Sequence, residues 1–590
     1  MHRKKNIASI LICIIFFSQA ALFGSEKADY VIVGAGTAGA TIANLLSDDP
    51  CTSVIVLHNG RNLTEDPDIK YTKNTLFTVV SAMFGSPFYQ TGYSIPQVYD
   101  NDRELFWALA VPEGGASSIN AGAWARGTDQ VYSQWEAIAG PQWSTATILG
   151  IYKGLEKYNG STPNPAARGY NGPLDIRQNP EPTQVMINFA QAISAAVNVP
   201  VIIDYNDPLT PMGAATQMQY TQNGENGQFR VSSATAFLNP SVITPGGKGV
   251  NGRKLTVKFN SPALRTIWKG NKAIGVEYFA CGKIKKVYAK KGVIICAGLY
   301  SSAFLMRSGV GPSKDLKALG IEVKYDNPNV GASLADQVLS VVAFSSNPKD
   351  TPVCAKNICP GKFPFPISID QIDKIPFNDP NDKELLLNAF FCSDFAFPAN
   401  SIFGQIANLP APGGDPAVRS VRLTTFNPIP GLTLALFDLV QPQSRGRITL
   451  SSTNPFDPPV IDNGMFSNPA DLTLYIQAYQ IYLKNISDAL HAIDDAYKLI
   501  FPPLEILNDQ ELLTTFIKEA AMSNQCWQSH CRMAPLNQGG VVDSYGKVYG
   551  VENLFVADDS IVPVGMDGTP MASAYLIAAN IARLLLEFNH

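Results

Sequence analysis

Histidine is scarce in this chain of 590 residues, which has only five, and no two cysteines are separated by two residues. Structural zinc sites take four cysteine or histidine ligands at short spacings, so we expect no bound metal. A surplus of charge is also lacking, because the formal net charge is only −4 and no long basic run occurs. That balance excludes the electrostatic footprint of a protein that binds nucleic acid.

Long apolar runs are lacking except at the N-terminus. Residues 7–17 (IASILICIIFF) follow a basic start and are shorter than the roughly 20 residues that a membrane-spanning helix needs. Small residues up to Ala20 are typical of a cleavage site. We predict a signal peptide in residues 1–25, cut near Ala20, and a secreted or periplasmic protein without a transmembrane segment in its mature chain. An uncleaved anchor is the alternative. In an oxidising compartment, Cys354 and Cys359 could close a small disulfide.

A glycine-rich turn follows the leader. Residues 29–36 (DYVIVGAG) predict a buried strand, and the apolar spacing from residue 37 predicts a helix. The G-x-G-x-x-G pattern between them allows a tight turn, a close approach of the backbone to a pyrophosphate, and close packing of helix on strand. We therefore expect a Rossmann-like nucleotide site. Its candidate residues are Gly34, Gly36, Thr37, Ala38 and Gly39.

The second predicted strand (residues 52–60, TSVIVLHNG) ends at His58. Dinucleotide-binding folds usually carry an acidic residue there for the ribose hydroxyls. A neutral imidazole can also hydrogen-bond a hydroxyl, so His58 is a candidate for the ribose. The alternative is an ordinary residue of a surface loop.

Residues 110–135 (AVPEGGASSINAGAWARGTDQVYSQW) resemble the glucose–methanol–choline (GMC) family of FAD oxidoreductases. That family has a Gly-Gly-Ser-Ser-x-x-Asn-like segment followed by Arg, Asp and Trp. Small residues would let the backbone lie against the flavin ring, which Asn120 could hydrogen-bond. Some members attach FAD through a histidine beside this asparagine, where this chain has Ile119, so the resemblance implies non-covalent FAD. The matching residues are Gly114, Gly115, Ser117, Asn120, Arg126, Asp129 and Trp135.

The resemblance extends along almost the whole mature chain. It implies an α/β fold, with a discontinuous Rossmann-like FAD-binding domain (26–160, 225–340 and 520–590). It also implies a substrate-binding domain (161–224 and 341–519) built on an antiparallel sheet. Gln337 stands where the family has histidine, at the end of its Val-Gly-x-Asn-Leu-x-Asp-His run. The matching stretches are 227–240, 293–312, 327–337, 441–461 and 539–563.

Members of that family oxidise an alcohol by moving hydride to flavin N5, while a base takes the hydroxyl proton. The base is usually the histidine of a His-x-x-Gly-Thr-Cys-x-Met run. Here SNQCWQSHCRMA (523–534) aligns Cys526 with that base and His530 with the threonine. A thiol suits the task poorly, because its ordinary pKa is about 8.5 and burial raises it. His530 is the other candidate, provided that the backbone brings it into the site.

A second catalytic position, asparagine or histidine in the family, falls on Thr569, which can hydrogen-bond an alcohol oxygen but cannot carry charge. Asp558 matches an aspartate near the flavin. The resemblance thus implies a small-molecule alcohol as substrate and oxygen or a quinone-like compound as electron acceptor. Because His58, Cys526 and Thr569 all depart from the family pattern, two alternatives remain open. They are a hydroxynitrile-lyase-like enzyme on this scaffold and a protein that keeps the fold without catalysis.

Overall fold

The computed structural model describes residues 26–82, 85–178, 182–350, 381–383 and 405–587. The expected signal peptide (1–25) and the Cys354–Cys359 pair lie outside these ranges, so both remain predictions. Among the helices within them, none is long and apolar enough to cross a membrane.

The first sheet has seven strands, in the order β11-β2-β1-β14-β13-β12, with β25 also paired to β14. The strands β11, β2, β1, β14 and β25 pair in parallel and are rich in β-branched residues and leucine. β12 and β13 form an antiparallel extension. The strands are β1 (Glu26–Val33), β2 (Val54–Leu57), β11 (Leu255–Lys258), β12 (Ala263–Lys269), β13 (Lys272–Ala280), β14 (Lys283–Ile295) and β25 (Leu554–Val556).

The glycine turn between β1 and helix α2 (Thr37–Asp48) is as tight as the motif predicts. Gly34 has a φ of +101°, and a Cβ there would lie 2.3 Å from the carbonyl oxygen of Cys296. A Cβ on Gly39 would lie 1.9 Å from the carbonyl oxygen of Gly34. Only glycine fits either position. The turn therefore confirms the Rossmann-like βα unit.

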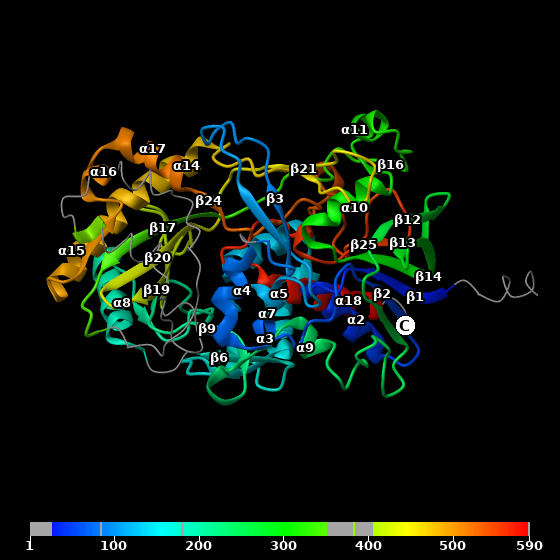
Figure 1. Ribbon diagram of the computed structural model, residues 1–590, viewed down its shortest axis with the longest axis horizontal. Coiled ribbons are helices and arrows are strands. Elements are labelled where there is room, and N and C mark those ends of the chain that lie inside the picture. The colour runs from blue at the N-terminus through cyan, green and yellow to red at the C-terminus, as the bar shows by residue number, and fades with distance from the viewer. Residues whose placement is uncertain (1–25, 83–84, 179–181, 351–380, 384–404, 588–590) are drawn as a thin grey trace, which may run out of the picture.

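The second sheet has eight strands, in the order β23-β17-β20-β19-β18-β8-β7, with β24 also paired to β17. Its pairs are antiparallel except for β7 with β8. Figure 1 places the two sheets on opposite sides of the molecule, with α5 and β3 between them. The strands are β7 (Val201–Ile202), β8 (Gly213–Ala215), β17 (Val338–Ser345), β18 (Gln405–Leu409), β19 (Val421–Ile429), β20 (Leu432–Leu439), β23 (Lys498–Phe501) and β24 (Met522–Ser523).

The predicted fold class is thus confirmed, since a Rossmann-like sheet and an antiparallel sheet share one chain. The domain boundaries remain a prediction. One strand, β17, runs across the expected boundary at residue 340. Helices pack one face of the antiparallel sheet into a second apolar core. These are α8 (Gln184–Val197), α14 (Pro469–Ala478), α15 (Lys484–Ile493) and α17 (Gln510–Ala520).

Further helices and strands complete the fold. The β3–β4 hairpin leads into α5, and a separate four-stranded sheet has the order β10-β9-β6-β5. The long C-terminal helix α18 packs against α2. These elements include β3 (Tyr89–Tyr93), β4 (Phe106–Ala110), α5 (Ala116–Ile119), α6 (Asp129–Ala139), α7 (Thr145–Leu155), β5 (Glu156–Asn159), β6 (Leu174–Gln178), β9 (Gln219–Asn223), β10 (Phe229–Arg230), α9 (Ser233–Phe237), α10 (Ser301–Arg307), α11 (Ser313–Ala318), α16 (Leu504–Asn508) and α18 (Met571–Glu587).

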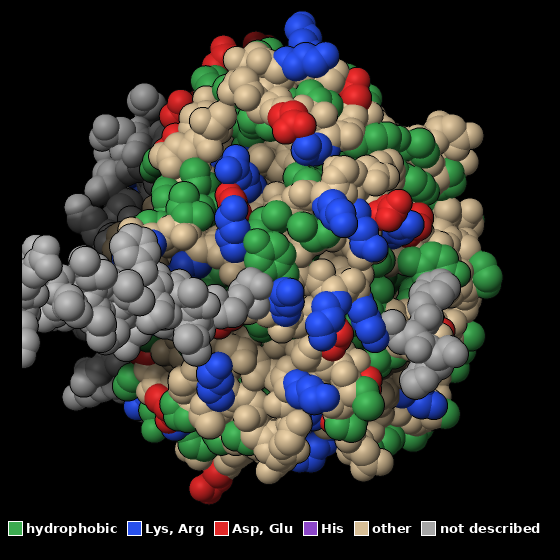
Figure 2. Space-filling model, turned by 90° about the vertical axis from the view of Figure 1, so that its right-hand side faces the viewer, with side chains coloured by type: hydrophobic (Ala, Val, Ile, Leu, Met, Phe, Trp, Pro, Cys, Tyr) green, Lys and Arg blue, Asp and Glu red, His purple; other side chains and the backbone are tan. Residues whose placement is uncertain are grey.

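Lysine and arginine side chains are spread over one face of the molecule (Figure 2). Several basic side chains of the β12–β14 extension have acidic partners. Glu277 pairs with Arg265 at 2.8 Å and with Lys286 at 3.3 Å, and Asp29 pairs with Lys290 at 3.5 Å. Exposed pairs of this kind contribute little to stability, and they lower the local positive charge.

Candidate functional site

A cavity of about 950 Å³ lies between the two sheets. This volume is at the upper end of the roughly 300–1,000 Å³ that is usual for sites of small molecules and cofactors. At one end it is lined by the β1–α2 turn and the end of β2. At the other end it is lined by the antiparallel sheet, the segment from Met522 to Trp527, and the residues that begin α18.

Two glycine-rich backbones meet in this cavity. Gly36 and Gly115 both line it, and a Cβ on Gly115 would lie 2.8 Å from the Cα of Gly36. Gly115 also has a φ of +55°, which disfavours any residue with a side chain. Gly34, Thr37 and Ala38 line the cavity as well. Backbone N–H groups at the start of α2 are thus open to a phosphate group, as the motif predicts.

Three of the predicted cofactor residues lie behind this surface rather than on it: Gly39, Gly114 and Ser117 are absent from the cavity lining. Ser117 Oγ donates to the carbonyl oxygen of Gly114 at 2.7 Å, and Ser117 N donates to Thr37 Oγ1 at 3.3 Å. Thr37 Oγ1 in turn donates to the same carbonyl at 3.3 Å. These bonds fasten the second glycine segment to α2, so these residues shape the site without facing the cavity.

His58 lines the cavity at the end of β2 and is only 7% exposed. The alternative of an ordinary surface-loop residue is therefore wrong. Its Nδ1 accepts a hydrogen bond from Ala35 N at 3.3 Å, which leaves the proton on Nε2. Burial lowers the pKa of His58 to about 4, although the carbonyls of Pro112 and Val111 oppose this. The Nε2–H of the neutral ring makes no hydrogen bond of standard geometry among the described residues, although the Pro112 and Val111 carbonyls lie near the ring.

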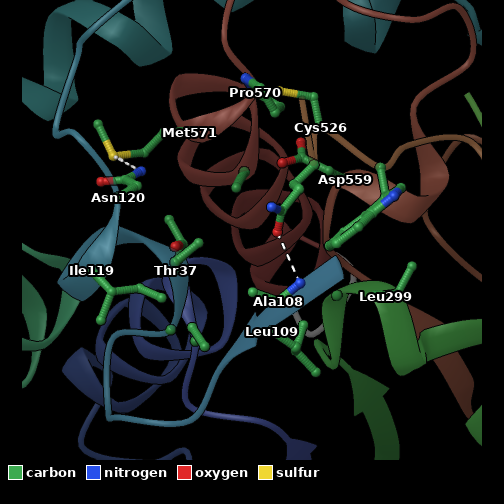
Figure 3. Close-up of a pocket in the computed structure, with 18 of the residues that line it drawn as sticks. Thr37, Ala108, Leu109, Ile119, Asn120, Leu299, Cys526, Asp559, Pro570 and Met571 are labelled. Atoms are coloured by element: carbon green, nitrogen blue, oxygen red, sulfur yellow. Dashed lines mark hydrogen bonds between the residues drawn. The ribbon is translucent and has the colours of Figure 1, made fainter. Parts of the chain in front are cut away.

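Asp558 and Asn120 also line the cavity. Asp558 Oδ2 accepts from Ser301 Oγ at 2.6 Å and from Gly298 N at 2.9 Å, while Oδ1 accepts from Ser560 N at 3.0 Å. The carboxylate thus ties the end of β14 to the segment after β25. Asn120 Nδ2 lies 3.2 Å from Met571 Sδ at the start of α18 (Figure 3).

Cys526 is part of the cavity wall (Figure 3). Its Sγ lies 3.4 Å from the carbonyl oxygen of Asn524, and the residue is 7% exposed. Burial, and then the charge of Asp336, raises the pKa of this thiol well above its ordinary range, to beyond 9.0. The group at the expected base position is therefore an uncharged thiol at neutral pH.

His530 lies elsewhere, which contradicts its expected role as the base. It is fully buried, does not line the cavity, and its Nδ1 is 2.9 Å from Ser302 Oγ in α10. The backbone around it is fixed, since its carbonyl accepts from Gly331 N and Cys531 N donates to the carbonyl of Ser560, both at 2.8 Å. Burial lowers the pKa of His530 to about 3. It is a neutral structural residue.

Thr569 lines the cavity as predicted, and its hydroxyl oxygen is buried without a hydrogen-bond partner among the described residues. Gln337 holds the preceding segment, because its Nε2 donates to the carbonyls of Met566 at 3.1 Å and Gly568 at 2.9 Å. A glutamine at the family's histidine position thus positions Thr569.

The chain matches the family model "GMC oxidoreductase" twice, in its N-terminal part over residues 28–339 and in its C-terminal part over residues 442–578. The chain belongs to the GMC oxidoreductase family. It is 29% identical over 574 residues to an uncharacterized GMC-type oxidoreductase of Mycobacterium tuberculosis, with 95% of this chain and 99% of the relative covered. It is 28% identical to an "Alcohol dehydrogenase [acceptor]" of Pseudomonas putida, with 95% and 96% covered.

Among solved structures, a FAD-dependent oxidoreductase from Chaetomium thermophilum superimposes with a TM-score of 0.76 at 23% identity, and the match covers 95% of this chain and 99% of that chain. At this identity the likeness concerns the GMC fold alone. The family supports FAD as the cofactor, and the glycine cradle described above fits it. Within the described ranges, no three His, Cys, Asp or Glu side chains gather as metal ligands.

Several charged residues of this GMC cavity escaped prediction from the sequence, among them Arg422, Asp438 and Asp559. Arg422 and Asp438 form an ion pair on the antiparallel sheet, with 2.7 Å between Arg422 Nη2 and Asp438 Oδ2. Asp559 lies close to Cys526 in Figure 3 and accepts from Ser573 Oγ at 2.7 Å. Burial raises the pKa of Asp559 well above its ordinary value. The two consecutive aspartates in VADDS could have indicated Asp559. No motif in β19 or β20 indicated Arg422 or Asp438.

Proposed function

We propose that this protein is an exported FAD-dependent oxidoreductase that removes hydride from the CH–OH group of a small-molecule alcohol. One observation carries the proposal: a single cavity joins the glycine cradle of Gly36 and Gly115 to Cys526 and Thr569, the two positions where the family has catalytic groups. Membership of the GMC family and the relative named as an alcohol dehydrogenase support it.

The residues of the cradle would hold the FAD without a covalent bond. Ile119 lines the cavity next to Asn120 (Figure 3) and offers no nucleophile to the flavin. His58 Nε2–H, buried and without a hydrogen bond of standard geometry among the described residues, would donate to a ribose hydroxyl. Bound FAD supplies the hydride acceptor, and oxygen or a quinone-like compound would regenerate it.

The substrate end of the cavity is built for binding an oxygen atom. Thr569 has a hydroxyl without a hydrogen-bond partner among the described residues, and α18 begins two residues later with its N-terminus at the cavity. The partial positive charge of a helix N-terminus favours an electron-rich oxygen or ring nearby. Thr569 would therefore orient the alcohol oxygen, while α18 would stabilise negative charge at this end.

The uncharged Cys526 favours a second candidate, a flavoprotein that retains the cofactor but does not oxidise alcohols. A general base needs a pKa near the working pH, whereas the pKa of this thiol is raised well above 9.0. The lyase alternative relied on His530 as the base, and His530 lies outside the cavity. The geometry therefore does not support the lyase alternative.

The test is the visible spectrum of the purified mature protein, repeated without oxygen after addition of a panel of alcohols. An oxidised-flavin spectrum that one alcohol bleaches would support the oxidoreductase and give its substrate class. Flavin that no alcohol bleaches would favour the second candidate. A colourless protein that binds no added FAD would contradict both. N-terminal sequencing of the secreted protein tests the predicted cut near Ala20.

A further inference from the structure

The antiparallel sheet turns one face toward the cavity, and the pleat decides which residues it presents. Cross-strand partners share a face. Arg422 on β19 faces Asp438 on β20, which faces Leu339 on β17, which faces Met522 on β24. All four line the cavity. This row lies next to the loop that carries Cys526.

The adjoining positions on the same face are mostly apolar. Thr424 on β19 faces Leu436 on β20 and Ile406 on β18, and Leu436 faces Val341 on β17. Phe426 follows two residues after Thr424, and all of these residues line the cavity. The sheet therefore offers one charged pair, Arg422 and Asp438, in the row beside the Cys526 loop, and a largely apolar wall beyond that row.

The pair of Arg422 and Asp438 has hydrogen-bonding capacity that the described residues do not use. Arg422 Nε donates to Asp438 Oδ2 at 2.7 Å, and Arg422 Nη2 donates to Gln337 Oε1 at 3.4 Å. In the part of the chain that the structure describes, Arg422 Nη1 and Asp438 Oδ1 are buried without a hydrogen-bond partner. The side chains are only 4% and 1% exposed. A buried charged group that lacks a hydrogen-bond partner destabilises the protein. A ligand that hydrogen-bonds to these two groups would remove that penalty and so bind more tightly.

We propose that Arg422 and Asp438 recognise a second oxygen function, a hydroxyl or carbonyl, that a mainly apolar neutral alcohol carries close to its reacting carbon. Arg422 Nη1–H donates to that oxygen, and Asp438 Oδ1 accepts from a hydroxyl. A carboxylate fits less well, because it would add a negative charge beside Asp438 in a buried site. The inference rests on the proposed function, since it names the substrate class of the same cavity.

The experiment compares the binding of probes that differ by one group: 2-phenylethanol, 1-phenylethane-1,2-diol, 2-hydroxyacetophenone and mandelate. Binding is measured by calorimetry on the protein as purified, with any flavin reduced by dithionite so that no turnover occurs. The diol or the hydroxyketone should bind at least about tenfold more tightly than 2-phenylethanol, the gain typical of a hydrogen bond to a charged group. Mandelate should bind more weakly than the diol.

The matched variant is Arg422→Met with Asp438→Leu, which removes both charges together and so leaves neither one buried alone. It should bind the diol and 2-phenylethanol with similar affinities. The control is Arg583→Met with Glu587→Leu, an exposed pair on α18 with 2.7 Å between Arg583 Nη1 and Glu587 Oε1. The control should keep the preference for the diol.

Equal affinities of the unmodified protein for all probes would overturn the inference, as would an unchanged preference in the Arg422→Met, Asp438→Leu variant. Tightest binding of mandelate would overturn its neutral-ligand part. These outcomes are separate from failure of the proposed function, because binding is read without turnover. A protein that prefers the diol but whose flavin no alcohol bleaches would keep the recognition pair and lose the oxidation.

Discussion

Replacing Cys526 by histidine should accelerate anaerobic flavin reduction by the best alcohol of the panel by at least about 10²-fold. The pKa of the buried thiol lies well above 9.0, so fewer than about 1 in 100 molecules hold a thiolate at pH 7. An imidazole with an ordinary pKa of about 6.5 is roughly three-quarters neutral at that pH. The fraction able to accept a proton thus rises by about 75-fold or more, and burial would only increase it.

The assay is stopped-flow reduction of the flavin from pH 5 to 9, with Cys526→Ala as the control for loss of the thiol. The Cys526→His rate should fall at pH values below about 6.5, because imidazolium cannot accept the proton. Cys526→Ala should be within a few-fold of the unmodified protein. The contradicting result is a Cys526→His variant that folds normally and retains flavin, yet whose flavin is reduced no faster than that of Cys526→Ala. The proton acceptor would then not be at position 526.

Three further changes test other parts of the site. Gly115→Ala should lose bound flavin by absorbance, because its Cβ would lie 2.8 Å from the Cα of Gly36. The control is Gly150→Ala in α7, where an added Cβ would meet no atom of another described part of the chain within 4 Å; it should retain flavin and stabilise the fold by roughly 0.5–1 kcal/mol. His58→Glu should tighten FAD binding about tenfold relative to His58→Gln, because a carboxylate is the usual ribose ligand; equal FAD dissociation constants would argue against His58 at the ribose. His530, with its pKa lowered to about 3, resists the proton that the unfolded chain takes up below about pH 6.5, so its contribution to stability is lost as the pH falls from there toward 3. Between pH 7.5 and 5 the unmodified protein should lose about 2 kcal/mol more unfolding free energy than His530→Asn. Denaturation curves that show an equal loss in the two proteins would contradict this.

The elements that a short stretch of sequence determines were predictable. The β1–α2 turn depends on glycines whose replacement would bring atoms within 2.3 Å or less of a carbonyl, so the motif carries its own geometry. The start of α18 is similar, since Pro570 directly precedes Met571, the first helical residue. Here local sterics decide the structure, and an alignment of motifs is sufficient to find it.

The sequence motifs did not predict that His530 points away from the cavity. Gln525 and Ser529 have φ values of +55° and +66°, which neither residue type demands. These turns, with the bonds to Gly331 and Ser560, direct His530 to α10 and leave Cys526 on the cavity. Tertiary contacts thus decided between two candidates that are four residues apart in the sequence.

The contact between Arg422 and Asp438 depends on the pairing register of β19 and β20, and no sequence motif encodes that register. Arg422 and Asp438 are brought together by the pairing of β19 with β20, and a slip of one residue would turn both side chains toward the helices of the second core. The position of Leu423 and Phe437 in that core shows the alternation. The segment also lacked a family signature, so only the assembled sheet reveals the pair.

The four departures from the family pattern share one electrostatic consequence. His58 is neutral because its pKa is about 4, Cys526 is a protonated thiol, and Gln337 and Thr569 cannot carry charge. In and beside the cavity, neutral groups thus stand at positions where the family pattern has an acidic residue, histidine or asparagine, while the antiparallel sheet contributes a buried arginine and aspartate. Uncharged hydrogen-bonding groups can position an alcohol without taking its proton. Selection among alcohols would then depend on the Arg422–Asp438 pair, and the rate of oxidation would be limited by the missing base. The Cys526→His variant should therefore change the rate of flavin reduction and leave the preference among probes unaltered.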